Sequence, residues 1–225
     1  MSKRLDKIAS YVKEGIGAAD VGTDHGYIPV MLRRRGYEGN IIGTDINEGP
    51  LSKARLSLAE AGFEDRVTLM LCDGLESVDP NSVNTIIVAG MGGDTITGIL
   101  DRAEWCSRKD IRLILQPVTK PEILRYWLIN YDFQITDEAL VKENGTVYQI
   151  ICAKPGNSEK YKDSELFTGK LSRIRSEELF HEHISIHIKR FKSAVENLEK
   201  ARRSGLDNWL EILKNILREL EDIDI

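Results

Sequence analysis

Short apolar segments alternate with amphipathic segments along most of the chain, from Ile8 to about Lys154. The apolar segments have the length of strands, whereas the segments between them repeat their apolar positions at helical spacing. Strands are therefore expected at residues 18–21, 40–44, 67–71, 85–89 and 112–115, and helices at residues 28–35, 50–61, 95–101 and 121–130. Strands that alternate with helices are joined by right-handed crossovers, so this order predicts a mostly parallel sheet.

Two later apolar segments, residues 133–140 and 147–153, lie on either side of Glu143-Asn144-Gly145. An Asn-Gly pair between two strands is a strong signal for a hairpin. The predicted sheet therefore consists of five parallel strands and a closing antiparallel hairpin. This is the order expected of a class I Rossmann-like methyltransferase sheet in the α/β class.

The pattern changes after residue 154, where turn signals become rare and basic and acidic residues nearly balance. Apolar residues recur at helical spacing in two long series, residues 180–198 and 209–220, which the pair Ser204-Gly205 separates. Two amphipathic helices with such a break predict an antiparallel helical hairpin. We therefore expect two domains, residues 1–154 with the sheet and residues 155–225 with a coiled-coil-like hairpin.

The composition excludes several classes of protein. The chain has 225 residues, 41% of them hydrophobic, and a formal net charge of −5. It has no apolar run of about 18 residues and no apolar signal-peptide core at its start, so we expect no membrane span and a cytoplasmic location. Cys72, Cys106 and Cys152 have no C-x-x-C spacing, and His183 and His187 share the face of an otherwise amphipathic helix. Neither a disulfide nor a metal site is expected.

The most informative chemistry follows the first predicted strand, where the chain enters a glycine turn and then a helix. A turn of this kind places backbone N–H groups around a ligand. Its candidate ligand-binding residues are Asp20, Gly22, Asp24, His25 and Gly26. The spacing differs from the G-x-G-x-x-G of dinucleotide binders, and two carboxylates disfavour a pyrophosphate but favour a cation. A purely structural turn is the alternative.

This turn resembles the D-x-G-x-G-x-G loop of methyltransferases that use S-adenosylmethionine (SAM), with Asp24 in place of the middle glycine. The amino group and the sulfonium of SAM are cationic, which fits the carboxylates of Asp20 and Asp24. The resemblance and the electrostatic argument therefore indicate the same cofactor.

Two further strand ends carry carboxylates. Asp45 ends the second strand, where a carboxylate accepts hydrogen bonds from both hydroxyls of a ribose. Asn47 supports the same hydroxyls or caps a helix. Asp73 and Gly74 follow the third strand and suit the adenine amino group, although a simple turn is an equally good interpretation.

Three glycines in four positions follow the fourth strand and predict a loop at the carboxyl edge of the sheet, where open α/β sheets hold ligands. We expect Ala89, Gly90 and Met91 to contact the cofactor, and Gly92 and Asp94 to lie beside the methyl acceptor. A plain strand–helix connection is the alternative. The Asn/Asp-Pro-Pro-aromatic motif of enzymes that methylate exocyclic amino groups is absent.

Basic residues cluster in two places, at Lys3, Arg4 and Lys7 and in the triplet at residues 33–35. Such clusters usually form solvated faces, but they also bind phosphates. The N-terminal cluster is the stronger candidate for contact with RNA.

Several of these segments occur together in the bacterial TrmK family, which the chain resembles over about its first two-thirds. The matching segments are residues 5–9, residues 20–29, Gly49-Pro50, Asp73-Gly74-Leu75, residues 89–93, Leu113-Ile114-Leu115-Gln116-Pro117, Leu124-Arg125-x-Trp127-Leu128 and Tyr148. The chain departs from the family at Val118, where the family usually has Asn.

The resemblance implies a SAM-dependent enzyme that methylates N1 of adenine 22 in tRNA, with a helical C-terminal domain that helps to hold the tRNA. N1 carries a lone pair and no proton, so attack on the methyl group needs no general base, and catalysis reduces to positioning and electrostatics. The product is cationic, so Asp94 and the carbonyls of residues 89–93 are candidates to stabilise it. Tyr27 is the candidate to stack on the extruded base, unless it is a core residue.

Two other functions remain open. The chain can use SAM with another RNA, a protein or a small molecule as acceptor, or it can be a SAM- or RNA-binding module without catalysis. An NAD-dependent enzyme is disfavoured by the carboxylates of the glycine turn. We expect a monomer or weak dimer.

Overall fold

A single sheet organises the first part of the chain and contains the seven predicted strands. The structure is a computed structural model, which describes residues 2–201 and 207–223. These form two compact units, Met1–Glu159 and Lys160–Ile225. The strands of the first unit are β1 (Gly17–Val21), β2 (Asn40–Asp45), β3 (Thr68–Leu71), β4 (Thr85–Gly92), β5 (Arg112–Thr119), β6 (Phe133–Glu143) and β7 (Thr146–Pro155).

The strand order is β3-β2-β1-β4-β5-β7-β6. The first five strands along the chain pair in parallel, whereas β7 pairs antiparallel with both β5 and β6. The predicted mostly parallel sheet with a closing hairpin is therefore confirmed. The order reverses between β1 and β4, and ligands of open α/β sheets bind beside the carboxyl ends of the strands at such a point.

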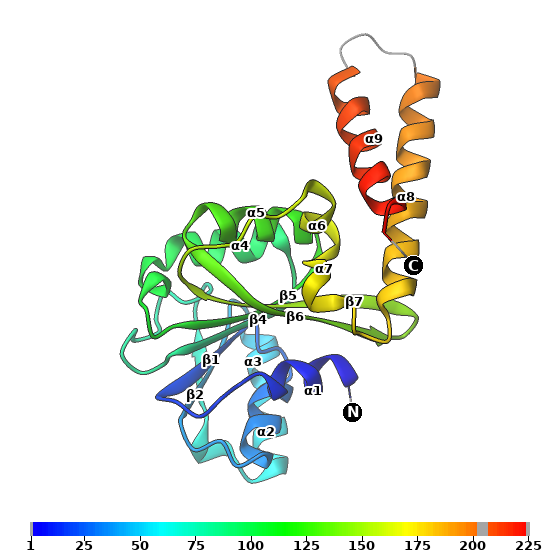
Figure 1. Cartoon of the computed structure of the whole chain (residues 1–225). Coiled ribbons are helices and arrows are strands. Elements are labelled where there is room, and N and C mark those ends of the chain that lie inside the picture. The colour runs from blue at the N-terminus through cyan, green and yellow to red at the C-terminus, as the bar shows by residue number, and fades with distance from the viewer. Residues whose placement is uncertain (1, 202–206, 224–225) are drawn as a thin grey trace. The chain divides into compact units, whose positions relative to one another are not determined.

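Helices cover both faces of the sheet (Figure 1). One face carries α1 (Lys3–Ser10), α2 (Tyr27–Arg34) and α3 (Glu48–Ala61), and the other carries α4 (Gly93–Arg102) and α5 (Pro121–Asn130). Two short 3₁₀ helices, Glu64–Arg66 and Glu104–Ser107, lie in connections. The central strands are buried between these layers, so their sequences are mostly apolar rather than alternating, with Asp20 in β1 and Thr85 in β4 as buried polar residues.

The structure departs from the sequence-based boundaries at several places, two of which bear on the site. The helix α1 is not among the predicted elements, although Leu5, Ile8 and Ala9 have helical spacing and Ile8 is fully buried. The expected loop at residues 90–92 is wrong, since β4 continues to Gly92. Gly90 forms a β-bulge there: Ala89 pairs with Gln116 and Met91 with Pro117, and Gly90 has a φ of 81° that favours glycine.

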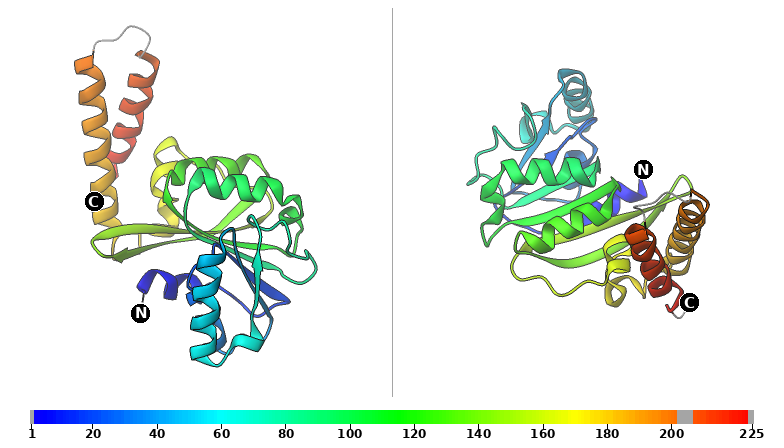
Figure 2. Two further views of the ribbon diagram at one scale, coloured as in Figure 1. Left: turned by 180° about the vertical axis from the view of Figure 1, so that it is seen from behind. Right: turned by 90° about the horizontal axis from the view of Figure 1, so that it is seen from above.

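The second unit contains four helices among its described residues, α6 (Asp163–Thr168), α7 (Leu171–Ile174), α8 (Phe180–Ala201) and α9 (Asp207–Glu221). The helices α8 and α9 pack antiparallel, as Figures 1 and 2 show. Apolar side chains between them are buried, among them Phe191, Val195 and Leu220. His183 is buried and bonds the Thr168 carbonyl at 2.9 Å, as expected for a packing residue. The predicted Ser204-Gly205 break lies outside the described residues.

A buried ionic cluster fixes α5 on the hairpin. Arg125 of α5 is 1% exposed, and Glu138 of β6 is 2% exposed. The Arg125 Nε donates to Glu138 Oε1 at 2.7 Å, and its Nη2 donates to Gln149 Oε1 of β7 at 2.6 Å. The guanidinium is thus desolvated, and a charge in that state requires its counter-charge.

We expect Glu138→Gln to lower the free energy of unfolding by about 3–5 kcal/mol, because it removes the carboxylate charge that faces the buried Arg125 guanidinium at 2.7 Å. Urea unfolding of the whole chain measures the change. The matched control is Glu48→Gln, which breaks the exposed pair with Arg55 and is expected to cost less than about 1 kcal/mol. Equal losses in both variants would contradict the assigned role of the cluster.

Candidate functional site

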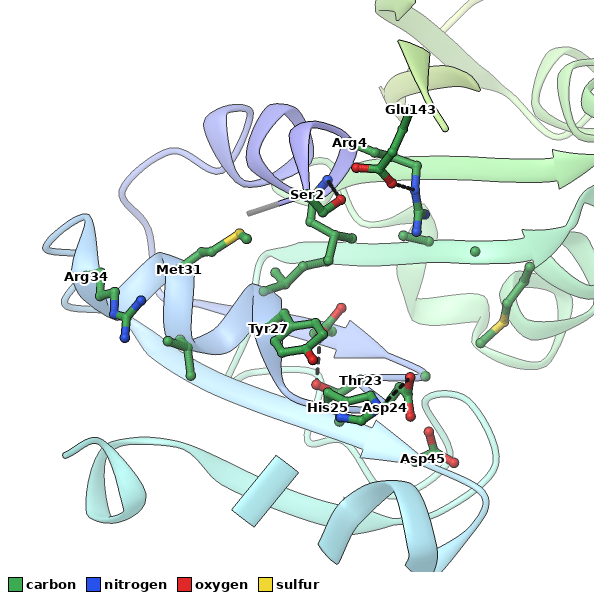
Figure 3. A pocket seen from close by; sticks show the side chains of 18 residues that line it. Ser2, Arg4, Thr23, Asp24, His25, Tyr27, Met31, Arg34, Asp45 and Glu143 are labelled. Atoms are coloured by element: carbon green, nitrogen blue, oxygen red, sulfur yellow. Dashed lines mark hydrogen bonds and ion pairs between the residues drawn. The ribbon is translucent and has the colours of Figure 1, made fainter. Parts of the chain in front are cut away.

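A cavity of about 910 Å³ lies at the carboxyl ends of β1, β2 and β4, where the strand order reverses (Figure 3). Three aspartates line it: Asp20 in β1, Asp24 in the turn after β1, and Asp45 at the end of β2. Of the predicted site residues, the cavity brings together Asp20, Gly22, Asp24, His25, Tyr27, Asp45, Ala89, Gly90 and Met91.

The backbone of the glycine turn is fastened to β2. The amides of Gly22 and Thr23 both donate to the Thr44 carbonyl, at 2.8 and 2.9 Å, and the amide of Gly26 donates to the Thr23 carbonyl at 2.8 Å. These N–H groups are engaged within the protein, so they do not form an anion-binding cradle. Asp24 has a φ of 47°, the left-handed conformation that the glycine of the general motif adopts without strain. The turn thus keeps the backbone of the motif and presents carboxylates to the cavity.

Asp20 is the most perturbed of these carboxylates. Its side chain is 3% exposed, and its Oδ2 accepts a hydrogen bond from the Thr23 hydroxyl at 2.7 Å. Burial raises its pKa from 3.8 to about 7, the Thr23 hydrogen bond lowers it, and the charge of Asp45 raises it again. The site therefore holds negative charge that no cation of the protein balances by direct contact with Asp20 among the described residues. A cationic ligand beside Asp20 would stabilise the ionised carboxylate and lower its pKa.

Asp45 is buried and accepts a hydrogen bond at Oδ1 from the Asn47 amide at 3.0 Å. Asn47 itself is the residue that precedes α3, and its side chain makes no capping hydrogen bond. Three predicted residues, Gly26, Asn47 and Gly92, line neither this cavity nor its neighbour.

A second cavity, of about 430 Å³, adjoins the first beside β3 and α4. The two share Gly22, Asp45 and Met91 as lining residues. The Met91 methyl group lies directly against Gly22, so close that a Cβ at Gly22 would overlap it. The side chain of Met91 therefore lies at the border of the two cavities.

The remaining predicted residues, Asp73, Gly74 and Asp94, line the second cavity. Asp73 accepts from Arg102 Nη2 at 2.8 Å. Asp94 accepts from Lys120 Nζ at 2.7 Å, and this hydrogen bond lowers the pKa of Asp94. Asp94 thus lines the second cavity together with Asp73 and does not line the first.

The wall opposite the aspartates is formed by residues that the sequence did not identify as a group. Figure 3 shows Ser2, Arg4 and Glu143 on this wall, with Tyr27 between it and the glycine turn. The sequence marks Arg4 only as part of a basic cluster and Glu143 only as part of a turn. Their proximity depends on the pairing of distant strands, for which no local sequence signal exists.

The triplet at residues 33–35 is divided: Arg33 is buried, Arg34 lines the cavity, and Arg35 pairs with Asp6.

The arrangement suits an extended ligand with a cationic part and a diol. Asp20 and Asp24 attract the cation, and Asp45 is placed to accept from hydroxyl groups. In the part of the chain that the structure describes, no three His, Cys, Asp or Glu side chains gather as metal ligands. None of the described helices combines the length and apolar character needed to cross a bilayer.

Comparison with known proteins defines the class. Residues 1–151 match the protein-family model described as "Methyltransferase domain". The match covers more than half of the chain and includes the carboxyl ends of β1 to β4 that line the two cavities. The chain therefore belongs to the methyltransferase-domain family.

The similarity extends to particular proteins. The chain is 28% identical to the tRNA (adenine(22)-N(1))-methyltransferase of Bacillus subtilis over 96% of this chain and 97% of that protein. The crystal structure of the Bacillus subtilis m1A22 tRNA methyltransferase TrmK aligns with a TM-score of 0.82 at 26% identity, covering 96% of this chain and 98% of that chain. A Streptococcus pneumoniae protein in complex with S-adenosyl-L-methionine aligns with a TM-score of 0.76 at 31% identity, covering 96% and 99%. The resemblance to the TrmK family is confirmed.

The titration of Asp20 predicts a pH-dependent stability. In the folded chain its pKa is about 7, against an ordinary value of 3.8. The folded state therefore holds a proton that the unfolded state releases, and stability falls as the pH rises from 3.8 toward 7. The variant Asp20→Asn has no carboxyl group to titrate, so it does not lose stability in this way as the pH rises. Its amide oxygen can still accept the hydrogen bond from the Thr23 hydroxyl.

We expect the free energy of unfolding of Asp20→Asn, measured relative to the wild type, to increase by about 2–3 kcal/mol as the pH rises from 5 to 8. Urea unfolding of both proteins without ligand, at each pH, gives this difference. A difference between the variants that stays constant with pH would show that the Asp20 carboxyl is not perturbed.

Proposed function

We propose that the protein is a SAM-dependent methyltransferase that modifies N1 of adenine 22 in tRNA. The observation that carries this proposal is the trio Asp20, Asp24 and Asp45 around one cavity at the switch point of a methyltransferase sheet. The similarity to the Bacillus subtilis enzyme over nearly the whole length of both chains supports the choice of substrate. The SAM-bound Streptococcus pneumoniae relative supports the choice of cofactor.

SAM fits the two cavities as an extended ligand. Its amino group and sulfonium lie toward Asp20 and Asp24, and its ribose hydroxyls toward Asp45. Its adenine enters the second cavity beside Asp73 and Gly74. Met91 has to turn aside to join the cavities, which an unbranched side chain does readily.

The acceptor adenine occupies the rest of the first cavity. N1 of a stacked or paired base is hidden, so the nucleotide has to be extruded before reaction. Tyr27 is 50% exposed, lines the cavity and stacks on His25, with ring centroids 5.2 Å apart. An exposed aromatic ring at this place supports its role as the stacking partner of the extruded base.

The reaction itself needs no proton transfer from N1. The lone pair of N1 forms the new N–C bond, while the electrons of the S–C bond remain on sulfur, which becomes a neutral thioether. The positive charge moves from the sulfonium to the adenine ring. Catalysis therefore consists of alignment in a polar site that stabilises the charge at its new position.

Two parts of the proposal concern the setting of the enzyme. Because tRNA is a cytoplasmic substrate, the proposal includes a cytoplasmic location. We also propose a monomer or weak dimer, which light scattering during gel filtration tests.

The central experiment is incubation of the purified chain with labelled SAM and a tRNA transcript. We expect label on N1 of adenine 22, mapped by mass spectrometry, and none on a matched transcript with guanine at position 22. Equal label on the second transcript would indicate another acceptor. Binding of SAM without S-adenosylhomocysteine release would indicate the non-catalytic alternative.

The role of Asp24 is tested by Asp24→Gly. Glycine adopts the φ of 47° found at this position, so the turn keeps its backbone and loses only the carboxylate. We expect SAM affinity, measured by calorimetry, to fall about tenfold, which corresponds to about 1.4 kcal/mol. The matched control is Asp132→Gly, since Asp132 has a φ of 57° and does not line the cavity. Unchanged affinity in Asp24→Gly would remove Asp24 from the cofactor site.

A further inference from the structure

Glu143 is a carboxylate on the acceptor side of the first cavity. It ends β6, lines the cavity together with Ala89, Gly90 and Met91 of β4, and its side chain is 20% exposed. Figure 3 shows it across the cavity from Asp24 and Asp45. The proposed cofactor lies along the aspartates, so Glu143 faces the space that remains for the methyl acceptor.

The first turn of α1 holds Glu143 in its ionised form. A hydrogen bond from Ser2, together with the backbone and side chain of Arg4, lowers the pKa of Glu143. Ser2 is also the residue that caps α1, because its Oγ accepts from the Leu5 amide at 3.2 Å. The carboxylate is therefore held by the first turn of a helix whose own buried residues, Ile8 and Ala9, anchor it in the core.

Arg4 links Glu143 to the end of β4. Its Nη1 donates to Gln116 Oε1 and lies 3.8 Å from the position that a Cβ on Gly90 would take. Its Nε lies 3.6 Å from Glu143 Oε2 and is buried without a hydrogen-bond partner in the described part of the chain. The guanidinium also lies 5.2 Å from the Tyr148 ring centroid. The Arg4 guanidinium thus lies between Glu143 and the backbone bulge at Gly90. Under the proposed function, the methyl acceptor lies beside this bulge.

The ion pair leaves Glu143 with capacity to bind a substrate. At 3.6 Å the contact with Arg4 Nε is an ion pair and not a hydrogen bond. A carboxylate offers about four lone-pair sites. An N–H donor of the acceptor can therefore bind Glu143 without displacing α1.

We propose that Glu143 is a further catalytic residue, which accepts a hydrogen bond from the exocyclic amino group of the acceptor adenine. This inference rests on the proposed function and adds the group that recognises the base. Arg4 and Ser2 act as positioning residues for Glu143.

The chemistry of the reaction makes this contact stronger as the methyl group is transferred. When N1 forms its bond to the methyl carbon, the positive charge is shared through C6 with the exocyclic nitrogen. The N–H donor becomes more acidic, and its bond to an ionised carboxylate strengthens in the transition state. The same carboxylate repels the carbonyl oxygen that guanine carries at this position, so Glu143 also selects adenine.

The test compares Glu143→Gln with the wild type on two tRNA transcripts, one with adenine and one with unsubstituted purine at position 22. Purine keeps N1 but lacks the exocyclic amino group. We expect the single-turnover rate of Glu143→Gln to fall about 10²-fold on adenine, while both proteins react equally on purine. The SAM dissociation constant is expected to stay unchanged, and the melting temperature to fall slightly because the ion pair with Arg4 is lost. The control is Asp110→Asn, whose carboxylate pairs with Arg108 and does not line the cavity.

Each other outcome contradicts one part of the argument. An unchanged rate on adenine, or an equal loss on adenine and purine, overturns the role of Glu143 in recognising the amino group. Weakened SAM binding in Glu143→Gln assigns the residue to the cofactor site instead. A wild-type chain that binds SAM but leaves adenine 22 unmodified overturns the proposed function, and the inference about Glu143 with it.

Discussion

The burial of Asp20 beside Asp45 is the constraint on which the site depends. Two carboxylates close to each other at the centre of a sheet are costly, and the raised pKa of Asp20 reflects that cost. The surrounding structure holds them there: Thr23 donates to Asp20, and the turn is fastened to Thr44 of β2. The fold therefore gives up stability to keep two carboxylates at this place, and under the proposed function the return is an attraction for the cationic cofactor.

The same edge of the sheet joins binding to reaction. The reversal of strand order opens the space, β1 and β2 supply the carboxylates, and the bulge at Gly90 brings the backbone of β4 to the acceptor side. The hairpin and α1 close the space from the opposite direction through Glu143 and Arg4. The aspartates and Glu143 thus face each other across one cavity. Under the proposed function, the positive charge that passes from sulfur to the adenine ring has a carboxylate near it at both ends of its path.

The sequence was sufficient for the sheet, its closing hairpin and the three aspartates, because strand periodicity and strand-end chemistry are local properties. The sequence was insufficient for those parts of the site that depend on contacts between segments far apart in the chain. Pairing of β4 with β5 extends the strand through residues that have loop propensity, which shifts Asp94 onto the first turn of α4 and toward Lys120. Glu143 comes near Arg4 because α1 packs against β6, a contact between segments far apart in the sequence that no local pattern specifies.

The position of Met91 has a consequence for how the cofactor is exchanged. Its methyl group covers Gly22 when the cavities are empty, so a ligand that spans both cavities has to displace it. In the proposed binding mode, the side chain moves off Gly22 when the cofactor enters and returns when the cofactor leaves. Exchange of the cofactor is then coupled to a rotamer change of a single unbranched residue.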